Sequence, residues 1–295
     1  MEEEKIGGHA AAGTRVTIRL PDDFHHHCRD GSKTAAILEH ASQRFGRLLI
    51  MPNLKPPVTT TEKALTYKEH IMSSMPNNKK RKSTDVNGDA NGESKISSCE
   101  PLMTLYLTDN TTAEEIAKAA KINEDAGRKV IVGCKYYPAG ATTNSDHGVT
   151  DIKKCYSALE EMQKHDMMLC IHSEVTTKGV DIFDREPEFI ENVMKPLVKD
   201  FTSLKITMEH ISTEEAVNYV MNESPDNVKA SITCHHLLYN RNRKFILPRN
   251  SLELFCRASC LSNSLCLAQT CLLEVFVRIC IVFRFSRQNN TAGHC

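Results

Sequence analysis

The sequence predicts an α/β protein, a (β/α)8 barrel of the TIM type in which the eighth strand is missing. Short apolar runs alternate with helix-like segments seven times along the first 240 residues. The runs are almost continuously apolar, which is typical of parallel strands covered by helices. This many strand–helix units favour closure into a barrel, and a doubly wound open sheet is the alternative.

The expected strands cover residues 15–20, 47–53, 102–108, 129–137, 167–174, 204–211 and 229–236. The first expected helix, within 32–46, has an apolar face and ends at a glycine; the residues concerned are Ile37, Leu38, Ala41, Phe45 and Gly46. Three later helices are expected to begin where a hydroxyl residue precedes a glutamate by three positions. These pairs are Thr59 with Glu62, Thr111 with Glu114, and Ser212 with Glu215.

Composition and patterning divide the chain into three parts. Residues 1–14 are expected to be a disordered tail and 15–243 an incomplete barrel, with a flexible polar insertion at 77–98. Lys and Arg total 37, as do Asp and Glu, so no basic excess suggests nucleic-acid binding. The acidic N-terminus resembles no signal peptide, and the cysteines before residue 235 are scattered singly, which predicts a cytoplasmic protein with reduced thiols.

The segment 244–295 has a different character, rich in Cys, Leu, Ser, Phe and Arg. Three interpretations compete. A membrane anchor within 265–285 is disfavoured by Glu274, Arg278 and Arg284. A zinc module is disfavoured by irregular cysteine spacing. The third, which we favour, is a retained intron or frameshift, so that this segment is unrelated to the barrel.

Histidines recur where the expected strands end. In "FHHHC", strand alternation places His25 and His27 on one face and His26 on the other. His172 ends the fifth strand and His210 the sixth. Because the carboxyl ends of barrel strands meet at one rim, these four imidazoles are expected to form a metal site.

Lys135 ends the fourth expected strand and would lie among these histidines. An ammonium group is repelled by metal ions, so the lysine is expected to be neutral or modified there. Carbamylation by CO₂ would convert the amine into a carboxylate that bridges two cations.

Several motifs in order, among them "PDDFHHHCRDG", "MPNLKPPVTT", "CKYYPAGATTNSDHGV", "IHSEV" and "ITCHHLLYNRN", resemble the type II dihydroorotases of the binuclear-zinc amidohydrolase superfamily. The resemblance covers roughly residues 15–243 and implies a barrel of the metallo-dependent hydrolase type. It implies two zinc ions bridged by carbamylated Lys135, with His25 and His27 on one and His172 and His210 on the other. Arg29 and Asn53 would bind the substrate carboxylate, and Thr142 and Thr143 would belong to a mobile lid.

The implied reaction is reversible hydrolysis of L-dihydroorotate to N-carbamoyl-L-aspartate in pyrimidine synthesis. The expected partner is this small-molecule substrate, with no nucleic acid and no membrane. A homodimer is also expected, because members of the family are often homodimers. The sequence departs from the family at Cys234 and His235. It also lacks the family's eighth-strand aspartate, the general acid–base, because no aspartate follows Asp226. The chain is therefore expected to be C-terminally truncated or mis-spliced and impaired. The alternatives are a non-catalytic scaffold or another cyclic-amide hydrolase.

Overall fold

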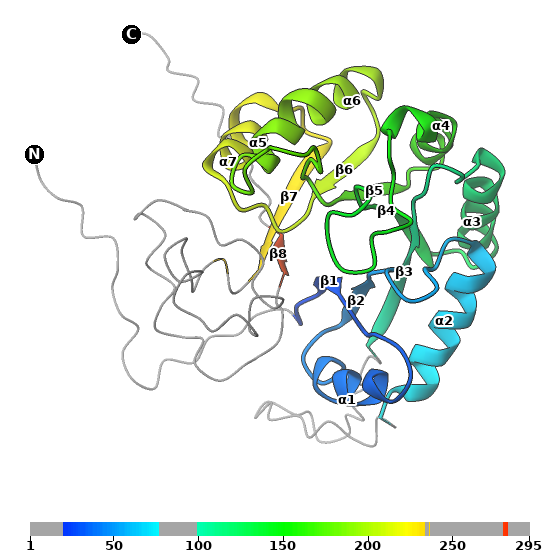
Figure 1. Ribbon diagram of the computed structural model, residues 1–295. Coiled ribbons are helices and arrows are strands. Elements are labelled where there is room, and N and C mark those ends of the chain that lie inside the picture. The colour runs from blue at the N-terminus through cyan, green and yellow to red at the C-terminus, as the bar shows by residue number, and fades with distance from the viewer. Residues whose placement is uncertain (1–19, 77–98, 234–235, 237–279, 283–295) are drawn as a thin grey trace, which may run out of the picture.

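Seven parallel strands, each hydrogen-bonded to the next in chain order, form the wall of an incomplete barrel with helices on its outside (Figure 1). The computed structural model describes residues 20–76, 99–233, 236 and 280–282. The parallel strands are β1 (Asp23–His26), β2 (Arg47–Ile50), β3 (Glu100–Tyr106), β4 (Ile131–Tyr136), β5 (Met168–Ile171), β6 (Lys205–Met208) and β7 (Val228–Thr233). Because strand order follows chain order without reversal, the open doubly wound alternative is excluded.

Helices follow six of these strands and pack on the outer face of the wall (Figure 1). They are α1 (Ser32–Ala41), α2 (Thr61–Ser74), α3 (Ala113–Asp125), η1 (Ile152–Cys155), α4 (Tyr156–Lys164), α5 (Arg185–Phe189), η2 (Ile190–Met194), α6 (Lys195–Asp200), α7 (Glu214–Asn218) and η3 (Tyr219–Glu223). The segments η2 and η3 are π-helical, and α5, η2 and α6 follow one another without a break.

The first strand begins later than predicted. The prediction of a strand at 15–20 falls outside the described residues except for Leu20, which is not in a strand. β1 instead starts at Asp23, so that the histidine run lies at its end. The other six predicted strands each overlap an observed one.

All three predicted helix starts are one residue too early. The side chain that accepts the first-turn N–H belongs to the next residue, a threonine in each case: Thr60 for α2, Thr112 for α3 and Thr213 for α7. These three residues have extended backbone angles, as an N-cap requires. The prediction that the N-cap is the hydroxyl residue three positions before the chosen glutamate was therefore wrong for all three helices.

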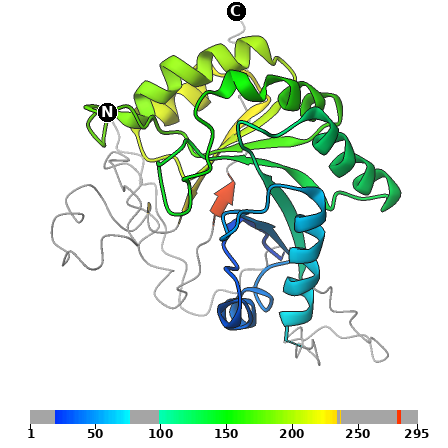
Figure 2. The same ribbon diagram turned by 45° about the vertical axis from the view of Figure 1, so that its right-hand side comes forward.

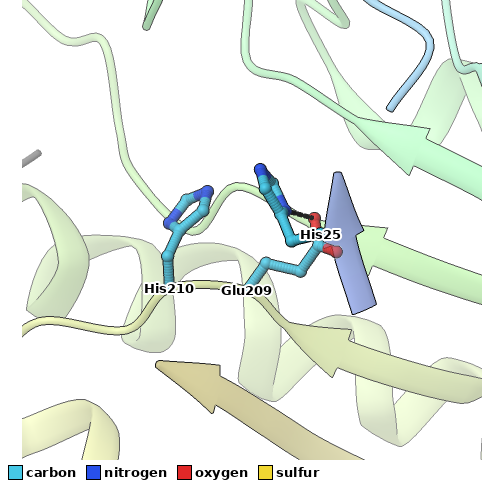
Figure 3. Close-up of side chains that lie close together, drawn as sticks. All are labelled: His25, Glu209 and His210. Carbon is cyan, nitrogen blue, oxygen red and sulfur yellow. Dashed lines mark ion pairs between the residues drawn. The ribbon is translucent and has the colours of Figure 1, made fainter. Parts of the chain in front are cut away.

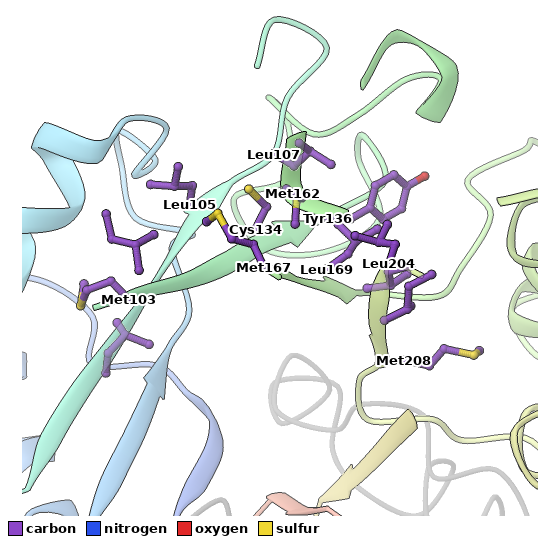
Figure 4. Close-up of a cluster of buried hydrophobic side chains, with 14 of the residues drawn as sticks. Met103, Leu105, Leu107, Cys134, Tyr136, Met162, Met167, Leu169, Leu204 and Met208 are labelled. Carbon is purple, nitrogen blue, oxygen red and sulfur yellow. The ribbon is translucent and has the colours of Figure 1, made fainter. Parts of the chain in front are cut away.

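The strands bury both faces, which explains their continuous apolar character. One large cluster packs between strands and helices and includes Leu105 of β3, Cys134 of β4 and Met162 of α4 (Figure 4). A smaller cluster of Leu49, Met51 and Cys170 is formed by residues that alternate with the helix-facing ones along β2 and β5. The strands therefore present a second set of side chains to the barrel interior, and this set continues into the site described below.

Gly133 allows β4 and β5 to approach closely. A Cβ built there would lie 1.8 Å from the carbonyl oxygen of Met168 on β5. Any larger residue would therefore push apart the two strands that carry Lys135 and His172.

A short strand from the C-terminal segment occupies the position between β7 and β1. This strand, β8 (Cys280–Val282), pairs antiparallel with β7 and lies near β1 (Figure 2). The sequence predicted that the eighth parallel strand of the barrel is missing. In agreement with this, the described residues contain no parallel strand after β7, and β8 is antiparallel. The remaining predictions for 1–14, for 77–98, for Cys234 and His235, and for the rest of 244–295 fall outside the described residues.

Candidate active site

The two outer histidines of the run 25–27 face each other at the end of β1. Nε2 of His25 lies 3.1 Å from Nε2 of His27. His26 points away from them, and its Nδ1 lies 2.8 Å from Oδ2 of Asp23. The other oxygen of Asp23 accepts the backbone N–H of His25 at 2.9 Å. The prediction that His25 and His27 share one face and His26 lies on the other is thus confirmed.

Lys135 lies at the same rim, wholly buried, and forms an ion pair with the equally buried Glu209. Oε2 of Glu209 also lies 3.1 Å from Nδ1 of His25 (Figure 3). Burial by itself would raise the pKa of Glu209, but Lys135 and His25 together lower it to about 2. The unmodified lysine therefore has a counter-charge here, whereas the sequence predicted a neutral or modified lysine among metal ions.

His172 and His210 complete the cluster from the ends of β5 and β6. Their ring centroids lie 4.9 Å apart, and that of His210 lies 5.0 Å from that of His25. Nε2 of His172 is 3.3 Å from Oε2 of Glu174. Burial lowers the pKa of His210 well below its usual value, and His172 and Lys135 lower it further. The imidazole is therefore neutral, which is the form that binds metal.

The donor set fits a divalent metal such as zinc. Zinc–nitrogen bonds of about 2.0–2.1 Å and tetrahedral angles separate two imidazole nitrogens by roughly 3.3 Å. The 3.1 Å between the Nε2 atoms of His25 and His27 is close to that value. In addition, one ligand atom from each of His25, Glu209 and His210 lies within 4.8 Å of the others. Imidazole nitrogens with a nearby carboxylate are the ligands that zinc prefers.

Asn53 and the loop with Thr142 and Thr143, which the sequence predicted to bind substrate, are in contact with each other. Asn53 is buried, and its Nδ2 donates to the carbonyl oxygen of Thr143 at 3.3 Å. Nδ2 of Asn144 donates to the carbonyl oxygen of Asn53 at 2.9 Å. The side chains of Thr142 and Thr143 are exposed. The loop that carries Thr142 and Thr143 is thus bonded to Asn53 through the carbonyl oxygen of Thr143 and the side chain of Asn144.

Arg29 follows the histidine run in a left-handed conformation, with φ of 61°. Its carbonyl oxygen accepts the hydroxyl of Tyr67 of α2 at 2.6 Å. Burial raises the pKa of Tyr137 well above its usual value, Glu209 raises it further, and the charge of Arg29 opposes this rise.

Two residues of the cluster were missed by the sequence analysis, Glu209 and Tyr137. Nζ of Lys135 lies 5.0 Å from the ring centroid of Tyr137. The Tyr137 hydroxyl is buried without a hydrogen-bond partner among the described residues. Two signals in the sequence could have identified them. Glu209 directly precedes His210 in "EHI". Tyr137 lies two residues after Lys135, so strand alternation puts both side chains on the same face.

The sequence matches proteins named dihydroorotase over most of the barrel. It is 50% identical over 232 residues to the dihydroorotase of Methylobacillus flagellatus, and 51% identical over 231 residues to that of Cupriavidus pinatubonensis. These matches cover 79% and 78% of this chain and 60% of each relative. Over these residues the chain is similar to dihydroorotases. It spans about 60% of the length of these relatives. No protein-family model matches it.

Solved structures of dihydroorotases share the barrel fold of this chain. The crystal structure of the Campylobacter jejuni dihydroorotase aligns with a TM-score of 0.66 at 29% identity, covering 83% of this chain and 63% of that one. The Saccharomyces cerevisiae dihydroorotase in complex with 5-fluoroorotic acid gives 0.65 at 27%, covering 82% and 62%. An L-hydantoinase from Arthrobacter aurescens shares the fold, with a TM-score of 0.53 at 15% identity over 76% of this chain and 49% of that one.

Among the described residues, no helix is long and apolar enough to span a membrane.

Proposed function

We propose that this chain forms the binuclear zinc site of a dihydroorotase and acts in the reversible hydrolysis of L-dihydroorotate to N-carbamoyl-L-aspartate, a step of pyrimidine synthesis. The observation that carries the proposal is the convergence of four histidines and Lys135 at the carboxyl ends of four strands. His25 and His27 would hold one ion and His172 and His210 the other. Lys135, once carbamylated, would bridge them.

When bound, two zinc ions would polarise the ring amide carbonyl and make a water acidic enough to attack it. The chain's own side chains bind and orient the substrate. The planar guanidinium of Arg29 suits a bidentate contact with the substrate carboxylate, and Asn53 would donate to the same group. The loop with Thr142 and Thr143, already anchored to Asn53, would cover the bound ring and exclude water.

Proton transfer to the leaving nitrogen is the step for which this sequence offers no familiar group. No aspartate follows Asp226. A positioned general acid–base contributes about 10²–10⁴-fold to a rate. We therefore expect the 295-residue chain to hydrolyse dihydroorotate at least ~10²-fold more slowly than the Methylobacillus flagellatus relative.

Metal analysis and a dihydroorotate assay test the proposal together. The comparison pairs the chain as printed with a chimera in which the relative's C-terminal part replaces residues 244–295. Both are expected to bind two metal ions per chain, and the chimera is expected to be the faster enzyme. If the 295-residue chain binds no metal, the proposed site is wrong. If it hydrolyses dihydroorotate at the rate of the relative, the expected slowing through the missing general acid–base is wrong.

The proposal places the protein in the cytoplasm. Cys28, Cys99, Cys134, Cys155 and Cys170 are buried free thiols, which fits a reducing compartment. A homodimer stays a prediction, to be tested by light scattering of the purified chain.

A further inference from the structure

Glu186, in the first turn of α5, is a buried carboxylate outside the metal cluster that accepts four hydrogen bonds. Its Oε1 accepts the hydroxyl of Ser173 at 3.1 Å. Its Oε2 accepts the backbone N–H groups of Ser212 and Thr213 at 3.0 and 2.9 Å, and the hydroxyl of Thr213 at 2.6 Å. Burying a carboxylate costs free energy unless hydrogen bonds compensate it, so four donors around one group indicate a built arrangement.

The four donors come from two loops that begin at proposed metal ligands. Ser173 directly follows His172 at the end of β5, and Ser212 lies two residues after His210 at the end of β6. One rigid carboxylate therefore fixes the distance between these two loops.

The backbone of His210 needs such support. Its φ of 46° lies in the left-handed region, which is unfavourable for a residue with a side chain. The N–H of His210 donates to Oγ of Ser231 and that of Ile211 to the carbonyl oxygen of Ser231, at 3.1 and 3.0 Å. The contacts of Ser212 and Thr213 with Glu186 fix the next two residues. Strained conformations of this kind persist only where surrounding bonds hold them.

We propose that Glu186 is a positioning residue that holds the loops after β5 and β6 so that the imidazoles of His172 and His210 can bind one metal ion together. The inference rests on the proposed function, because that function supplies the ion. Groups that orient metal ligands through a second contact change metal affinity by about 10–100-fold when they are removed.

A purely structural role is the competing explanation, since Thr213 also caps α7 through the N–H of Ala216 at 3.2 Å. Asn123 provides a matched control. It is buried and makes three hydrogen bonds to backbone groups of Val130 and Ile131, at the opposite end of β4 from Lys135. Removing its side chain should destabilise the fold while leaving the rim unchanged.

The experiment compares four full-length chains: wild type, Glu186→Ala, Ser173→Ala and Asn123→Ala. Each is stripped of metal, titrated with Co²⁺ and followed by its visible spectrum, which reports ligand geometry. We expect two ions in wild type and Asn123→Ala, and one ion in Glu186→Ala. Ser173→Ala, which loses a single hydrogen bond, should bind the second ion about tenfold more weakly.

Imidazole NMR of the metal-free chains gives a readout that needs no ion. The signals of His172 and His210 should shift in Glu186→Ala and stay unchanged in Asn123→Ala. Two tight ions with a wild-type spectrum in both Glu186→Ala and Ser173→Ala would overturn the inference. If wild type itself binds no ion, the proposed function fails, and unmoved imidazole signals in the Glu186 and Ser173 variants would then overturn the positioning role separately. Should Glu186→Ala not fold, Ser173→Ala alone decides the outcome.

Discussion

Lys135 and Glu209 form an ion pair in which both side chains are almost wholly removed from solvent. Taking two charges out of water is costly, and their attraction offsets that cost only while both are present. The pair joins Lys135 of β4 to Glu209, which directly follows β6 and is 74 positions away in the chain. Losing one partner therefore leaves a buried charge with too little compensation.

We expect Lys135→Met to destabilise the metal-free chain by about 3–5 kcal/mol, because the Glu209 carboxylate loses its cation. The double variant Lys135→Met with Glu209→Gln should recover most of that loss. Urea unfolding measures both. Lys121→Met is the control, since Lys121 and Asp125 form an exposed pair, for which a loss below about 0.5 kcal/mol is expected. A Lys135→Met cost as small as that of the control would show that the charge pair is not buried in solution.

At the scale of the element, the position of each helix start was decided by backbone geometry. Thr60 has φ of −130° and ψ of 158°, and its hydroxyl accepts the N–H of Lys63 at 3.3 Å. Thr59, the predicted cap, only accepts from the exposed Nζ of Lys63 at 3.2 Å. Because three threonines in a row, Thr59 to Thr61, lie at the start of α2, the sequence alone does not identify the N-cap, and the structure assigns it to Thr60.

Thr60→Ala is expected to cost about 1 kcal/mol of unfolding free energy, the usual value for a lost N-cap. Thr59→Ala should change it by less than about 0.5 kcal/mol, because its one contact is with an exposed, mobile ammonium. Chemical denaturation of both variants beside wild type makes the comparison. If Thr59→Ala proved the more damaging change, the assignment of the cap to Thr60 would be wrong.

At the scale of the molecule, the last parallel strand of the wall, β7, is paired with a strand of unusual direction. β1 to β7 are parallel, whereas β8 runs antiparallel to β7. β8 pairs with Ser231, Ile232 and Thr233, so it covers backbone groups of β7 that would otherwise form an open edge. Open parallel edges of this kind recruit other chains.

A chain that ends at residue 243 lacks β8, and we expect it to self-associate and to bind more of a hydrophobic dye than the full chain. Light scattering and dye fluorescence measure these changes. Removing residues 1–14 serves as the control and should change neither. If the shortened chain scatters light like the full one, then β8 does not protect the edge of β7.

The sequence by itself determined the strand–helix alternation, the pairing of His25 with His27, and the places of Lys135, His172 and His210 at strand ends. These features follow from periodicities of two and of about three and a half residues, which depend only on neighbours in the chain. The apolar runs were therefore sufficient to predict parallel strands covered by helices, and the observed strand order decided for the barrel over the open sheet.

Only the tertiary structure decided which group neutralises Lys135, how Glu186 joins two loops, and what lies beside β7. Glu209 is 74 residues from Lys135, and Ser212 is 26 residues from Glu186. Local sequence patterns carry no information about such partners, because a buried charge is satisfied by whichever donor or acceptor the packing brings within about 3 Å. The contacts of Lys135 with Glu209 and of Glu186 with Ser212 form only when the strands pack side by side. The site therefore exists only in the folded chain.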